Sequence, residues 1–339
     1  MMSGFVPGLQ LSRDFYTEVV RPLVGAVPHS AALIGAGSEV LAFDTERSTD
    51  HGWGPRVVLF AAAGDVGRVR EAVERGLPTV FGGYPTVFGG GHGVVVADPG
   101  AWLGERLGFD PREGAGVLDW LSAPWQRLAE VTSGEVFHDG LGVLEPVRAA
   151  LRWYPADLWR YVLAAQWRRL AQEESFPGRC GEVGDGLGSA VLTARLAREV
   201  MRLALLMRRR YPPYSKWLGS AFARLSGAAE LGDALAGAVA AGDWRERERH
   251  LGRAYERVAV LHNRLGLTEP LETSTRAFFE RPFQVIGAQR FADALGAAVT
   301  DPVVAALPPV GSVDQFADSA DLLTRPQGCR AAAGAVLGL

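Results

Sequence analysis

The stretch of this sequence that most constrains its fold runs from Ala31 to Phe60 and reads AALIGAGSEVLAFDTERSTDHGWGPRVVLF. The apolar run 31–34 predicts a short strand, and the glycines after it favour a sharp turn. Ser38 is a candidate N-cap for a short helix. The N–H groups at a helix N-terminus can hold a phosphate, so we expect this stretch to serve a nucleotide.

Length and composition limit the class of protein. The chain has 339 residues, 48% of them hydrophobic, which predicts two domains that each bury a core. The formal net charge of −3 indicates no general attraction to nucleic acid or to anionic membranes. The sequence lacks an apolar run long enough to span a bilayer and a pattern typical of a signal peptide. Its two cysteines have no metal-ligand spacing, and we expect a cytoplasmic protein.

The first half of the chain predicts strands mixed with helices. Apolar residues at helical spacing indicate a leading helix over 8–26. The apolar run 57–63 predicts a buried strand, and 65–74 a helix. The segment 78–93 contains PTVFGG twice and predicts a flexible crossover loop without the Lys and Ser/Thr of a P-loop. A further strand is expected over 94–97.

The second half predicts helices almost throughout. Tyr154-Pro155 marks the boundary between the two expected domains, because proline fits the start of a helix and not its interior. The expected helices are a long one over 156–174, another over 190–210 and a pair over 229–265. A glycine-rich loop is expected between the first two, and smaller helices over the remaining residues.

Gly37-Ser38, followed after eleven residues by Asp50, resembles the Gly-Ser…Asp-x-Asp signature of the nucleotidyltransferase fold, to which polymerase beta and the kanamycin nucleotidyltransferases belong. The wider string GSEVLAFDTERSTDHGWGPR more closely resembles the bacterial family called domain of unknown function 4037, whose members read Asp-His-Asp-Trp at this point. Here Gly52 replaces the second aspartate. The resemblance implies an α+β protein, with a nucleotidyltransferase-like α/β domain with a mixed sheet over 1–150 and an all-α helical domain over 151–339.

The chemistry implied by the resemblance is the transfer of a nucleoside monophosphate. Two Mg²⁺ ions about 3.5–4 Å apart activate the attacking oxygen and stabilise the leaving pyrophosphate. Carboxylates at i and i+2 of an extended segment point to the same side, so Gly52 removes a ligand and leaves Asp50 as the catalytic and metal-binding acid. A third acid is expected where this chain has 94–96, all valine. Asp98 is the nearest substitute, and we favour the interpretation that it caps the next helix.

The resemblance also implies roles in the helical half. Lys216, the only lysine among 35 basic residues, would bind the triphosphate together with Gly37 and Ser38. Glu173 or Glu174 would be the general base, although a solvated helix end is the more economical interpretation of each.

The glycine-rich loop carries further candidates. Arg179, Glu182 and Asp185 would bind the acceptor. A helix connection stiffened by local ion pairs explains these three residues almost as well.

Three functions remain open at this point, and the first two belong to different classes. The first is Mg²⁺-dependent transfer of a nucleotidyl group from a nucleoside triphosphate to a small-molecule acceptor. The alternative is a non-catalytic protein that binds a nucleotide and regulates a partner, and a cleft used for metal-independent chemistry is a third. Neither a nucleic acid nor a membrane is expected as partner.

Overall fold

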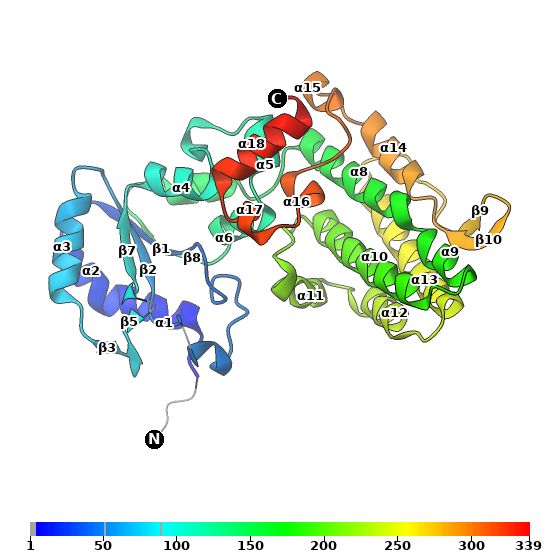
Figure 1. Cartoon of the computed structure of the whole chain (residues 1–339). Coiled ribbons are helices and arrows are strands. Elements are labelled where there is room, and N and C mark those ends of the chain that lie inside the picture. Colours follow the sequence, from blue (N-terminus) through cyan, green and yellow to red (C-terminus); the bar gives the residue numbers. More distant parts are fainter. Residues whose placement is uncertain (1–4, 51, 89) are drawn as a thin grey trace. The chain divides into compact units, whose positions relative to one another are not determined.

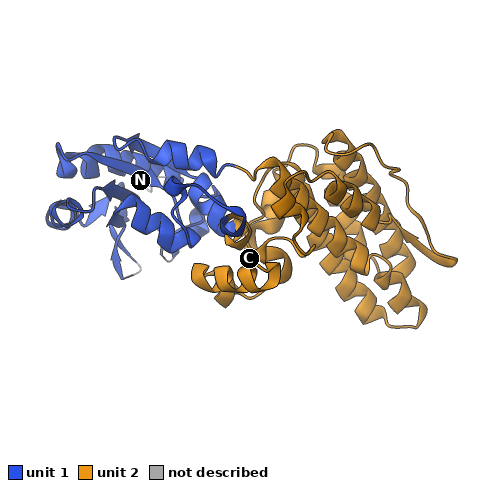
Figure 2. Cartoon of the chain, turned by 90° about the horizontal axis from the view of Figure 1, so that it is seen from above, with its two compact units in different colours: residues 1–119, 126–152 blue, residues 120–125, 153–339 orange. Residues whose placement is uncertain are grey.

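The computed structural model describes residues 5–50, 52–88 and 90–339 (Figure 1). The chain divides into two compact units (Figure 2). Unit 1 holds the described residues up to Asp119 and the segment Gln126–Arg152. Unit 2 holds Trp120–Trp125 and Trp153–Leu339.

Unit 1 is built on a mixed sheet of four strands. The strands are β1 (His29–Leu33), β2 (Val57–Ala61), β7 (Val94–Ala97) and β8 (Glu135–Asp139). Their order is β7-β2-β1-β8, with β1 antiparallel to both neighbours and β2 parallel to β7. All five residues of β2 are buried, as its continuous apolar sequence predicts. With the largely helical second unit, this sheet confirms the α+β class.

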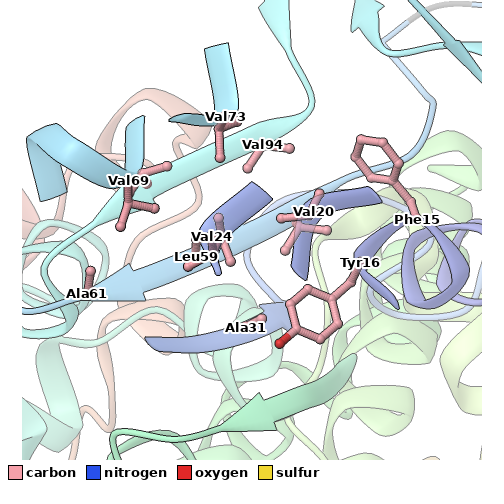
Figure 3. Packing of buried hydrophobic residues seen from close by; sticks show 12 residues of the cluster. Phe15, Tyr16, Val20, Val24, Ala31, Leu59, Ala61, Val69, Val73 and Val94 are labelled. Atoms are coloured by element: carbon pink, nitrogen blue, oxygen red, sulfur yellow. The ribbon is translucent and has the colours of Figure 1, made fainter. Parts of the chain in front are cut away.

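One face of the sheet is covered by helices, some of which precede β1 in the sequence and one of which follows β2 (Figure 3). They are α1 (Gly8–Phe15), the π-helix η1 (Tyr16–Val20), α2 (Arg21–Val24) and α3 (Val66–Gly76). Phe15, Val20 and Val73 are fully buried there against Ala31 and Leu59 of the strands. The predicted leading helix is therefore present, as three consecutive segments.

The remaining elements of unit 1 are short. They are the 3-10 helices η2 (Glu46–Asp50) and η3 (Pro111–Glu113), and the helices α4 (Pro99–Leu107), α5 (Val117–Ser122), α6 (Trp125–Thr132) and α7 (Leu144–Ala150), of which α5 and α6 cross into unit 2. Trp102 of α4 packs edge-on against Phe60 of β2, with ring centroids 5.4 Å apart. The segment with the repeated PTVFGG forms two small hairpins where a loop was predicted. Their strands are β3 (Val80–Phe81) with β4 (Tyr84–Pro85), and β5 (Val87–Phe88) with β6 (Gly91–His92).

Unit 2 is a helical bundle with one added hairpin. Its long helices are α8 (Ala156–Glu173), α10 (Gly186–Met207), α12 (Ala229–Ala240) and α13 (Trp244–Arg264). Its shorter elements are α9 (Phe176–Glu182), α11 (Ser215–Ala223), β9 (Arg276–Phe278), β10 (Arg281–Val285), α14 (Gln289–Ala297), α15 (Pro302–Ala305), α16 (Val313–Phe316), α17 (Ala320–Leu323) and α18 (Pro326–Leu337). Helix α8 packs against both α10 and α14.

Two predictions for unit 2 were wrong in part. The glycine-rich loop contains helix α9, in which Pro177 occupies a first-turn position that tolerates proline. Segment 281–285, expected to be helical, is strand β10, in which Phe283 and Val285 are buried and Gln284 is exposed. That alternation is the period of a strand. None of the described helices is long and apolar enough to cross a bilayer.

Candidate functional site

Gly35–Ser38 form the turn that follows β1. Gly35 has φ +94° and donates its N–H to the carbonyl oxygen of Glu130 at 2.9 Å. Gly37 has φ +143°, which side-chain-bearing residues rarely adopt. A Cβ atom at Gly37 would lie 2.5 Å from Oε1 of Glu39 and 2.6 Å from Nη1 of Arg56. The backbone can pass between these charged groups only because position 37 is glycine.

The helix predicted after Ser38 does not form. Residues 36–42 are bends and turns, closed by a hydrogen bond from the N–H of Phe43 to the carbonyl oxygen of Ser38 at 2.8 Å. Ala42 there adopts a φ of +56°. So short a segment offers too few helical hydrogen bonds to offset the cost of nucleating a helix. Any phosphate site must therefore use the turn itself.

The turn has backbone donors available. Within the part of the chain that the structure describes, the N–H groups of Ala36, Gly37 and Ser38 donate no hydrogen bond. Ala36 is exposed, and the other two residues are partly exposed. Successive N–H groups in a turn are suited to bind an anion.

Arg56 and Glu39 hold the turn in place. Nη1 of Arg56 lies 2.6 Å from Oε1 of Glu39, and Nη2 of Arg56 donates to the carbonyl oxygen of Ala36. Glu39 is only 2% exposed; burial raises the pKa of its carboxyl, and the charge of Arg56 acts in the opposite direction. The positive charge of Arg56 is thus matched by a carboxylate inside the protein.

Arg106 is the second guanidinium beside the turn, and no carboxylate is paired with it. Its Cζ would lie 3.3 Å from a Cβ atom at Gly35, and it stacks 4.5 Å from the ring centroid of Trp102. Among the described residues its side chain makes no hydrogen bond and no ion pair. Glu130, the carboxylate whose charge most raises the pKa of Arg106, is bound by Arg127 at 2.9 Å. Burial therefore lowers the pKa of Arg106, which means that its charge is held at a cost.

The metal ligands expected near Asp50 are incomplete. Asp50 ends the 3-10 helix η2 and is exposed. Gly52 has φ +61° and supplies no ligand, and His51 lies outside the described residues. In residues 5–50, 52–88 and 90–339, no group of three or more His, Cys, Asp or Glu side chains is placed to hold a metal ion.

Strand β7 supplies no acid either. Val94 and Val96 are buried in the core, whereas Val95 is 48% exposed. The third carboxylate was expected at one of the three positions that valines occupy here, and Val95 is the valine whose side chain is exposed. Asp98 accepts a hydrogen bond from the N–H of Ala101 at 3.0 Å and caps α4, which confirms the interpretation that we favoured. The carboxylates around Asp50 and at the end of β7 therefore do not fit a pair of Mg²⁺ ions, which need several carboxylate oxygens.

The two glutamates at the end of α8 already have partners. Oε2 of Glu173 lies 2.8 Å from Nε of Arg195. Glu174 accepts hydrogen bonds at 3.0–3.1 Å from the backbone N–H groups of three consecutive residues, 286–288. It is 8% exposed, and burial raises the pKa of its carboxyl to about 7. The expectation of a solvated helix end is wrong for Glu174, which ties the loop after β10 to α8.

The three candidates for acceptor binding lie at the junction of α9 and α10. Arg179 and Glu182 belong to α9, and the guanidinium of Arg179 lies 5.3 Å from the ring centroid of Phe176. Asp185 caps α10 by accepting a hydrogen bond from the N–H of Gly188 at 2.7 Å. All three candidates are exposed.

Lys216 lies in the first turn of α11. Its side chain is exposed, and its Nζ atom lies 4.9 Å from the ring centroid of Trp217. The sequence candidates thus fall in both units: Gly37, Ser38 and Asp50 in unit 1, and the others in unit 2.

Comparison with known proteins identifies one domain. Residues 120–218 match the family model described as Domain of unknown function (DUF4037). The chain carries a DUF4037 domain. No curated protein and no solved structure matches the chain. The DUF4037 match includes α8–α10 and Lys216 but not the turn at Gly35–Ser38.

Sequence reasoning missed the charged residues around the turn, all of which lie outside the DUF4037 match. Glu39, Arg56 and Arg106 were not among the candidates. Arg106 follows Trp102 by four residues, a spacing that places both on one face of a helix. That spacing was the available signal for Arg106. Arg56 is brought to the turn by the start of β2, a tertiary arrangement that no local pattern encodes.

Proposed function

We propose that unit 1 binds a nucleoside triphosphate, with its phosphates on the Gly35–Ser38 turn. The observation that supports this most directly is the arrangement of three unused backbone N–H groups beside Arg106, a half-buried cation without an internal acid partner. A phosphate group accepts hydrogen bonds from both kinds of donor.

The positive charge of Arg106 favours an anion as the ligand of this site. Burial of a cation without a partner is unfavourable, and a bound phosphate would relieve that cost. The planar guanidinium can donate two parallel hydrogen bonds to one phosphate group. Each charge-assisted hydrogen bond contributes about 1.5–3 kcal/mol.

The residues present favour binding of the nucleotide without catalysis. Transfer of a nucleotidyl group to a small-molecule acceptor, implied by the resemblance, needs Mg²⁺ and a set of acids around Asp50. Gly52 and the valines at 94–96 stand where the resemblance implies two of these acids. A protein that senses a nucleoside triphosphate and regulates a partner needs only the turn and its cations.

A series of adenine ligands tests the proposal. Calorimetric titration with ATP, ADP, AMP and adenosine should give affinities that fall with each phosphate removed, because the phosphates make the proposed contacts. Equal affinity for ATP and adenosine would contradict it.

Transfer is tested separately. The protein should not transfer the α-phosphate of labelled nucleoside triphosphates to compounds in a metabolite extract, with or without Mg²⁺. Label transfer by the unaltered protein would refute the non-catalytic proposal. Gly52→Asp restores the acid that the resemblance implies, and transfer by this variant alone would assign the inactivity to the missing carboxylate.

A further inference from the structure

Helix α10 carries a row of exposed apolar side chains near its N-terminus. Leu187 and Val191 are four residues apart on one face of α10, and Val183 lies in the turn between α9 and α10 that precedes them. Their exposed fractions are 78%, 60% and 78%. Ala190 and Ala194 complete the set, which we call the α10 stripe.

The α10 stripe does not serve the packing of unit 2. The side chains that face the bundle come from the other side of the helix, including Thr193, Leu196 and Ala197. Of the large apolar side chains that the structure describes, only Phe279 is more exposed than Val183 and Leu187. A solvent-facing helix surface is normally polar, and contiguous apolar side chains on a surface mark an interaction site.

Opposite charges lie at the two ends of the α10 stripe. Glu182 and Asp185 are exposed at its N-terminal end. Arg195 lies at its other end, where its Nε contacts Glu173 and its side chain remains 49% exposed. A guanidinium has five N–H donors, so Arg195 can serve a second carboxylate. A stripe with acids at one end and a cation at the other complements a second copy of itself that runs antiparallel.

We propose that the α10 stripe forms a twofold interface between two copies of this chain. A twofold axis near residue 189 sets Leu187 of one copy against Val191 of the other, and Arg195 against Glu182 and Asp185. The small side chains of Ala190 and Ala194 let the two helices approach closely.

The size of the α10 stripe sets the expected strength of the dimer. The eight residues of α10 from Leu187 to Ala194 span about 12 Å. The patch is small beside the roughly 800 Å² per partner of a stable interface. The dimer is therefore weak, and its fraction rises with protein concentration and falls on dilution.

Analytical ultracentrifugation over a dilution series tests the proposal. The full chain should show a reversible monomer–dimer equilibrium, and Leu187→Glu and Val191→Glu should each raise the dimer Kd about tenfold or more. Both sites are exposed, so the variants should retain the circular dichroism spectrum of the parent. Val239→Glu on α12, where the valine is 54% exposed, is the matched control and should leave the Kd unchanged. A monomer at every concentration, or a dimer that both α10 variants leave intact, would overturn the proposal.

Cross-linking tests the antiparallel geometry. In a Cys180→Ser background, which leaves the buried Cys329 as the remaining native cysteine, Ala190→Cys should form a covalent dimer under mild oxidation. Val239→Cys should not. A reversible dimer that Ala190→Cys fails to cross-link would place the interface elsewhere.

Discussion

Replacement of Glu174 by alanine removes the acceptor of three hydrogen bonds. The N–H groups of Ile286, Gly287 and Ala288 lose their partner, and Ile286 and Ala288 are fully buried. An unsatisfied buried donor costs about 1–3 kcal/mol. We expect Glu174→Ala to lower the free energy of unfolding by about 3–5 kcal/mol at pH 5, where the carboxyl is largely protonated.

The penalty should shrink as the pH rises. Burial raises the pKa of Glu174 from its ordinary value of 4.5 to about 7 in the folded protein. The folded state therefore binds the proton more tightly than the unfolded state, and the resulting stability is fully present below pH 4.5 and lost as the pH rises through 7. Between pH 5 and pH 8 the parent loses about 2–3 kcal/mol through this group and the variant does not.

Urea unfolding of parent and variant at pH 5, 6, 7 and 8 measures the effect. The difference between the two unfolding free energies should fall by about 2–3 kcal/mol over this range. Glu269→Ala, at an exposed glutamate in the loop before β9, is the control and should change stability by less than about 0.5 kcal/mol at every pH. A difference that stays constant or grows with pH would show that the three N–H donors outweigh burial, and would refute the reasoning.

Two further substitutions test contacts that position the site in unit 1. Asp98→Ala removes the acceptor for the N–H of Ala101 and should lower the unfolding free energy by about 1 kcal/mol in urea titrations; an unchanged value would refute the capping role. Gly134→Ala adds a Cβ atom that would overlap the carbonyl oxygen of Leu33 at a φ of +66°, and should cost about 2 kcal/mol or more by the same measurement. Gly104→Ala, inside α4 with no atom within 4 Å of the added Cβ, should be neutral or stabilising by up to about 1 kcal/mol, and equal effects of the two alanines would contradict the contact.

The fold could be predicted where the hydrophobic pattern is long and regular. The continuous apolar run of β2 is typical of a buried strand, and the apolar residues of the leading helix have helical spacing. The pair α12 and α13 is broken where Asp243 caps α13. Prediction failed where the pattern was short. Phe283 and Val285 alternate with exposed neighbours over only five residues, too few to separate β10 from a turn of helix.

The turn shows a different limit of sequence reasoning. Gly35 and Gly37 were expected at a sharp turn and have positive φ. The continuation as a helix was wrong, because so short a segment does not offset the cost of helix nucleation; Glu39 there pairs with Arg56, the residue before β2. That ion pair and the approach of Arg106 depend on segments that lie 17 residues or more away in sequence, so no local pattern could predict them.

The hydrogen-bond donors that contact Glu174 could not be predicted for the same reason. At the end of α8 its sequence neighbours are polar, which is typical of an exposed helix end. The N–H groups that it binds belong to residues 286–288, more than a hundred positions later. Burial by a distant segment changed a solvated carboxylate into a structural acceptor with a raised pKa.

Binding of ATP to an Arg106→Gln variant tests the proposed phosphate site most directly. The glutamine keeps a polar side chain but lacks the charge, so calorimetry should show an affinity for ATP reduced about tenfold or more. Arg75→Gln, at an exposed arginine of α3 that faces Glu71, should bind ATP like the parent. Equal affinities for the parent and Arg106→Gln, or no ATP binding by the parent at all, would contradict the proposal that the turn and Arg106 hold the phosphates.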